Sequence, residues 1–89
     1  MARRVLTVTN KHGLHARPAA AFVQAAGQFT SSITLRNLSR GTRTVNAKSI
    51  MQILTASVDC GSEIELIAEG DDAEQAVEAL VQVISDHQE

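Results

Sequence analysis

The chain of 89 residues has little of several residue types that mark other classes of protein. Its single cysteine, Cys60, cannot form an internal disulfide, which agrees with a reducing compartment. It has no tryptophan or tyrosine and only two phenylalanines, and its formal net charge is −2. A nucleic-acid surface needs a basic field and aromatic stacking platforms, so protein partners are expected and nucleic acid is not.

Long apolar runs are also missing. No stretch approaches the ~18 apolar residues that a membrane span requires, and the segment after Met1-Ala2-Arg3-Arg4 is too short and polar for a signal peptide. We therefore expect a cytoplasmic protein without membrane insertion. The length predicts a single domain, residues 1–89, whose modest core leaves no room for a deep substrate cavity, so a functional site should lie on the surface.

Alternation of apolar and polar residues predicts four strands, at residues 4–9, 32–36, 42–47 and 63–70. The second and third strands follow each other across a turn at 37–41 and should form a hairpin. The side chains expected to face the core are Leu6, Val8, Ile33, Leu35, Val45, Ala47, Ile64, Leu66 and Ala68.

Three helices are predicted between and after these strands. Residues 16–26 carry an apolar stripe, and Gly27 should end this helix in a left-handed conformation. Ser49 and Gln52 have the spacing of a capping box at the start of a short second helix. Asp71 and Asp72 start a third helix that runs to about residue 85. The order βαββαβα predicts an α+β, open-faced two-layer sandwich, with a four-stranded antiparallel sheet covered on one face by three helices.

The segment from Gly13 to Ala20 holds the residues best suited to chemistry. His15 lies where the first helix begins, and Pro18 suits its first turn. Backbone N–H groups at a helix N-terminus together with the guanidinium of Arg17 could bind a phosphoryl group next to the nucleophilic imidazole. The sequence shows no catalytic carboxylate paired with this histidine and no glycine-rich nucleotide loop. By themselves, these residues fit a phosphoryl site or a purely structural helix start.

Metal binding is not expected. His12 and His15 are close in sequence, but no third ligand of the Cys, Asp or Glu type lies near them in the chain.

The short second helix carries more apolar residues than one stripe can bury. We expect some of Ile50, Met51 and Leu54 to be exposed, forming a docking patch beside Arg17, with the small Ala20 allowing close approach of a partner helix. The alternative is a helix buried on two sides.

Two motifs resemble one known family. Gly13-Leu14-His15-Ala16-Arg17-Pro18-Ala19 is similar to the active-site motif of the HPr family of histidine-containing phosphocarriers in the bacterial phosphotransferase system. Ala47-Lys48-Ser49-Ile50-Met51 is similar to the stretch around the family's regulatory serine, and the resemblance extends over nearly the whole chain. It implies that His15 accepts a phosphoryl group, that Ala16 and Arg17 bind it, and that Arg17 assists its transfer. Ser57 departs from the family pattern, since glycine is common there.

The resemblance also implies partners. A carrier of the phosphoenolpyruvate-dependent sugar phosphotransferase system would take the phosphoryl group from phosphorylated enzyme I and pass it to enzyme IIA domains, without a cofactor, as a monomer and not as an enzyme itself. A dedicated HPr kinase/phosphorylase would act on Ser49, although capping alone explains this serine as well. The alternatives are a carrier of the nitrogen-related branch or a non-catalytic regulatory interaction module; an enzyme with its own small substrate fits least, because no concave site is expected.

Overall fold

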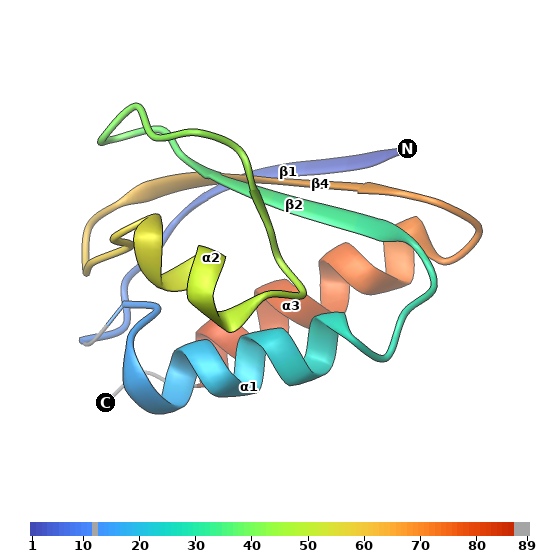
Figure 1. The fold of residues 1–89 in the computed structure, drawn as a ribbon, viewed down its shortest axis with the longest axis horizontal. Coiled ribbons are helices and arrows are strands. Elements are labelled where there is room, and N and C mark those ends of the chain that lie inside the picture. The colour runs from blue at the N-terminus through green and yellow to red at the C-terminus, as the bar shows by residue number, and fades with distance from the viewer. Residues whose placement is uncertain (12, 87–89) are drawn as a thin grey trace.

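Four strands form one antiparallel sheet, and three helices pack against one of its faces (Figure 1). This computed structural model describes residues 1–11 and 13–86. The elements are β1 (Ala2–Thr7), α1 (Ala16–Ala26), β2 (Ser32–Asn37), β3 (Val45–Asn46), α2 (Ile50–Thr55), β4 (Glu63–Glu69) and α3 (Ala73–Asp86). The predicted fold class and element order are confirmed. The order of strands across the sheet, β1-β4-β2-β3, adds what the alternation pattern left open.

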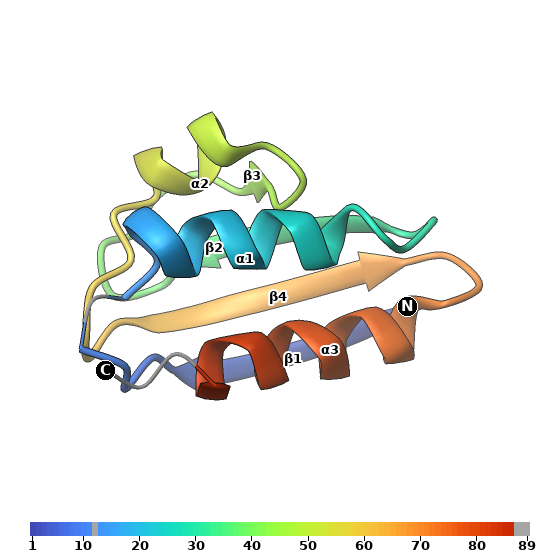
Figure 2. The same cartoon turned by 90° about the horizontal axis from the view of Figure 1, so that it is seen from below.

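The strand β4 is the centre of the fold, because it pairs with β1 on one side and β2 on the other. Its residues Ile64, Leu66 and Ala68 are fully buried, as the alternation predicts. Helices α1 and α3 lie side by side across this face of the sheet (Figure 2). The helical residues that complete the core are Ala19, Phe22, Ala26, Ile53, Ala73, Ala76, Val77, Leu80 and Ile84. Burial of these apolar side chains is the main force that holds the two layers together.

The third strand is shorter than predicted. Pairing with β2 is limited to two positions, Thr34 with Asn46 and Leu35 with Val45. Beyond them, the backbone N–H of Arg40 donates to the side-chain oxygen of Asn37, and the N–H of Thr42 donates to its carbonyl. These bonds close a turn of their own, so residues 42–44 do not extend the ladder.

One predicted detail at a helix end is wrong, and a second is confirmed only in part. Gly27 has φ −66° and is not left-handed, because its N–H continues the helical pattern with a bond to the carbonyl of Val23. The capping box of α2 is only half formed. The hydroxyl of Ser49 accepts from the N–H of Gln52 at 3.3 Å, but the Gln52 side chain accepts from Asn46, because the Ser49 N–H already donates to the Asn46 carbonyl.

Within residues 1–11 and 13–86, no helix has the length and apolar character that crossing a membrane requires.

Candidate functional site

His15 occupies the N-cap position of α1, and its side chain is 40% exposed. It makes no side-chain capping bond, so its ring is available for other contacts. The next residue, Ala16, has φ +52°, a left-handed conformation that costs an alanine about 1 kcal/mol or more. Pro18 follows in the first helical turn, as the sequence predicts, and its side chain is buried. The chain therefore turns sharply at the histidine before it enters the helix.

The segment before His15 is held against the loop that precedes β4. The N–H of Leu14 donates to the carbonyl of Val58 at 2.8 Å. Gly13 has φ +60°, and a Cβ atom there would lie 2.1 Å from the same carbonyl oxygen, so only glycine allows this approach. The side-chain amide of Asn10 donates to the Gly13 carbonyl at 2.9 Å. These contacts bring residues 57–59 next to the histidine.

The side chain of Asp59 contacts His15 directly. One carboxylate oxygen lies 2.8 Å from Nε2 of His15, and the other lies 3.4 Å from Nη2 of Arg40. The pKa of the Asp59 carboxyl is lowered, chiefly by the hydrogen bond with His15 and further by Arg40. Because an ionised carboxylate can only accept, Nε2 carries the hydrogen of this bond.

The prediction that no carboxylate is paired with the histidine is therefore wrong. Asp59 is 44 residues away in sequence, and no local motif connects the two. The topology of the sheet does indicate that the two residues lie near each other. Thr7 at the end of β1 lies opposite Glu63 at the start of β4, so the loops that contain His15 and Asp59 emerge at the same end of the sheet.

The groups expected to bind phosphate lie at the same helix end. Ala16 and Arg17 are exposed, and no described residue accepts a hydrogen bond from their backbone N–H groups or from the Arg17 guanidinium. Nδ1 of His15 likewise has no partner in the part of the chain that the structure describes. Free N–H groups and the helix dipole favour an anion here, next to a ring nitrogen that can carry a lone pair.

Helix α2 carries exposed apolar residues. Ile50, Met51 and Leu54 are 38%, 72% and 41% exposed, whereas Ile53 is fully buried. The predicted exposure is confirmed, and a helix buried on two sides is excluded. Helix α2 packs beside the N-terminal half of α1, on which Ala20 is exposed (Figure 2).

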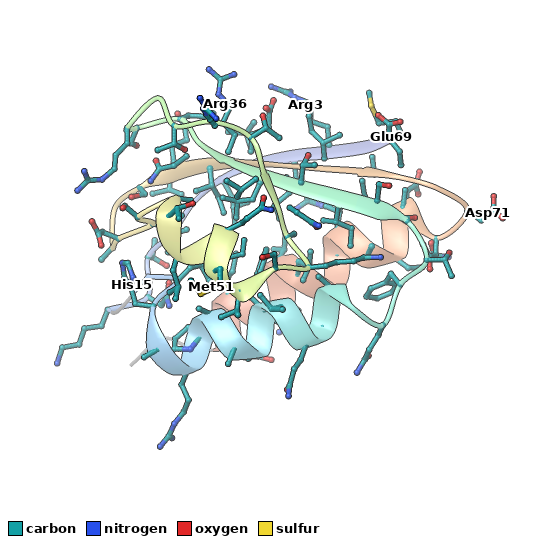
Figure 3. The ribbon with its side chains drawn as sticks, viewed as in Figure 1. Arg3, His15, Arg36, Met51, Glu69 and Asp71 are labelled. Carbon is teal, nitrogen blue, oxygen red and sulfur yellow. The ribbon has the colours of Figure 1, made fainter. Side chains whose placement is uncertain are left out.

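Figure 3 shows Met51 on the same side of the molecule as His15. Arg3 and Arg36 project from the sheet face that carries no helices, and Asp71 lies at the opposite end (Figure 3). Ser49, at the N-cap of α2, is half-buried and immediately precedes the exposed residues Ile50 and Met51.

No group of three potential metal ligands occurs among the described residues. His12, which is close to His15 in the sequence, lies outside them.

Known proteins resemble this chain over nearly its whole length. The family model PTS-HPr, described as "PTS HPr component phosphorylation site", matches residues 2–86. The phosphocarrier protein HPr of Treponema pallidum is 48% identical over 80 residues, which cover 90% of this chain and 88% of that protein. A multiphosphoryl transfer protein of Haemophilus influenzae is 47% identical over 79 residues, 89% of this chain, and this chain spans only 16% of its length.

Solved structures with HPr in their names share this fold. The crystal structure of HPr-C-His from Thermoanaerobacter tengcongensis superimposes with a TM-score of 0.90 at 46% identity, covering 98% of this chain and 94% of that one. A family model over nearly the whole chain, relatives at this level of identity and a shared fold lead to one conclusion: the chain belongs to the HPr family of phosphocarrier proteins of the phosphotransferase system.

Proposed function

We propose that this chain carries a phosphoryl group on His15, taking it from phosphorylated enzyme I and passing it to enzyme IIA domains of the sugar phosphotransferase system in the cytoplasm. The observation that carries the proposal is the half-exposed imidazole at the start of α1, whose Nε2 is bonded to Asp59 while Nδ1 has no partner among the described residues. Family membership supports the same role.

The transfer is a direct exchange between two imidazoles. The lone pair of Nδ1 attacks the phosphorus of the donor's phosphohistidine, and the donor's N–P bond breaks with its electron pair returning to the donor ring. The reverse exchange on an acceptor protein regenerates His15. The exposed backbone N–H groups of Ala16 and Arg17 and the Arg17 guanidinium are proposed to stabilise the phosphoryl oxygens during both steps.

The docking surface is the second part of the proposal. It consists of Ala20 on α1 and Ile50, Met51 and Leu54 on α2. Met51 lies on the same side of the molecule as His15 (Figure 3), so a partner that covers both also excludes water from the exchange. The unbranched thioether of Met51 can repack against several partners, as a shared carrier requires. The carrier is proposed to act as a monomer.

Ser49 is proposed as a regulatory site for an HPr kinase/phosphorylase. A phosphate at this N-cap adds about −1.5 to −2 charge where the helix dipole is favourable, so the fold should persist. The same charge lies directly before Ile50 and Met51 and would oppose an acidic partner and an incoming phosphoryl group. Ser49→Asp should keep its melting temperature and accept phosphate on His15 more slowly. An unchanged acceptance rate would exclude this regulation.

The central test is incubation with phosphoenolpyruvate and enzyme I, followed by mass spectrometry. The wild-type chain should gain one phosphoryl group, and His15→Ala should gain none while retaining its fold, since His15 is not part of the core. His87→Ala, which removes another histidine of the chain, is the matched control. Arg17→Ala should accept ~10-fold more slowly, because it loses one charge-assisted contact. Phosphorylation of His15→Ala would refute the proposal.

Transfer from the phosphorylated chain to purified enzyme IIA domains then tests the branch. Fast transfer to sugar-specific domains and slow transfer to the nitrogen-related domain is the expected result; the opposite ranking would assign the chain to the nitrogen-related branch.

A further inference from the structure

We propose that Asp59 is a positioning residue for His15, which holds the ring with its Nδ1 lone pair free and provides the counter-charge when the ring is phosphorylated. This inference rests on the proposed function. Its basis is the contact of 2.8 Å between a carboxylate oxygen of Asp59 and Nε2 of His15.

Asp59 is itself held in place from several directions. Its backbone N–H donates to the hydroxyl of Ser62 at 3.1 Å, and its second carboxylate oxygen lies within reach of the Arg40 guanidinium. Arg40 comes from the turn between β2 and β3, where its own N–H donates to Asn37. The Asp59 carboxylate is therefore held by its own loop and by the turn that carries Arg40. His15 comes from a third segment, the one that leads into α1.

The hydrogen bond determines which ring nitrogen can react. A neutral imidazole has one N–H, and a carboxylate cannot donate, so the bond to Asp59 favours the tautomer with hydrogen on Nε2 and a lone pair on Nδ1. When Nδ1 forms the bond to phosphorus while Nε2 keeps its hydrogen, the ring becomes cationic. The Asp59 carboxylate then faces a positive ring, which favours the phosphorylated state, as the aspartate of a Ser-His-Asp triad favours its imidazolium.

The role of Arg40 is to hold the carboxylate from its far side. The side chains of Asp59 and Arg40 are both exposed, so solvent screens the attraction between their charges. Loss of Arg40 should therefore have a smaller effect than loss of Asp59.

The test compares Asp59→Ala and Asp59→Asn with Asp71→Asn, which removes the same charge at the opposite end of the molecule (Figure 3). The ¹⁵N chemical shifts of the His15 ring, recorded at about pH 9 where an ordinary imidazole is neutral, report the tautomer. Asp59→Ala should move these shifts toward those of a free imidazole, whereas the amide oxygen in Asp59→Asn can still accept from Nε2 and should keep them near wild type.

The rate of phosphoryl acceptance from enzyme I is the second measurement. Both Asp59 variants should be slower by ~10-fold, because both lack the counter-charge. Asp71→Asn should match the wild type. Arg40→Met should be slowed by roughly 2-fold to 3-fold, with Arg36→Met on the outer sheet face as its control.

Two results would overturn the inference: ring shifts in Asp59→Ala equal to those of the wild type, or an acceptance rate in either Asp59 variant equal to that of Asp71→Asn. Because Asp59 is exposed in a turn, the variants should fold, and circular dichroism verifies this. If the wild-type chain itself accepts no phosphoryl group, the proposed function fails, and the ring shifts still decide whether Asp59 sets the tautomer.

Discussion

Ser57 offers a direct test of how the loop beside the site is built. Its φ of +52° lies in the left-handed region, which favours glycine and is strained for a serine. A non-glycine residue in this region destabilises the folded state by about 1–2 kcal/mol. Replacing it with glycine removes this strain but also raises the entropy of the unfolded chain, which cancels about 0.4–1 kcal/mol of the gain. The hydroxyl of Ser57 makes no hydrogen bond with the described residues, so its removal costs little.

Ser57→Gly should therefore stabilise the protein by ~0.5–1 kcal/mol, which for a chain of this size corresponds to a melting temperature higher by roughly 2–8 °C. Urea unfolding followed by circular dichroism gives the free energy. Ser57→Ala is the matched control, because it removes the hydroxyl but keeps the left-handed cost, and it should stay within ~0.5 kcal/mol of the wild type. A Ser57→Gly variant no more stable than Ser57→Ala would refute the strain argument.

Three further predictions concern the loop before His15, the exposed surface of α2 and the pH dependence of stability. Gly13→Ala should lower the free energy of unfolding by at least ~2 kcal/mol and slow phosphate acceptance, because the new Cβ would overlap the Val58 carbonyl. Urea unfolding measures the stability, and a variant as stable as the wild type would contradict this geometry. Met51→Asp should weaken partner transfer ~10-fold and leave stability within ~0.5 kcal/mol, because this side chain is 72% exposed; a collapse of the melting temperature would instead identify it as a core residue.

Asp72→Asn tests the pH dependence of stability. The Asp72 carboxylate accepts from the hydroxyl and backbone N–H of Ser31 and of Thr30, which lowers the pKa of Asp72 from 3.8 to about 2. A lowered pKa means that this carboxylate stabilises the fold fully above about pH 4 and loses its effect as the pH falls through 2. Asp72→Asn should be less stable than wild type at pH 7, and the difference should shrink toward pH 2; a constant difference would contradict this linkage.

The sequence alone determined which faces of the strands and helices are buried. Alternation placed Ile64, Leu66 and Ala68 in the core, and the apolar stripe placed Phe22 there, because a strand repeats every two residues and a helix every 3.6. The start of α1 at the histidine follows from Pro18 in the first turn, and the exposure of Met51 follows from an excess of apolar residues over what one stripe of α2 can bury.

Tertiary structure decided what depends on residues far apart in the chain. The contact between His15 and Asp59 exists because antiparallel pairing of β1 and β4 brings two distant loops to one end of the sheet. The length of β3 depends on hydrogen bonds that Asn37 accepts from the N–H groups of Arg40 and Thr42. The Gln52 side chain accepts from the Asn46 N–H instead of the Ser49 N–H, and no local pattern reports either arrangement. Local periodicity sets which face of an element is buried, but only the packing of the elements sets which polar groups meet.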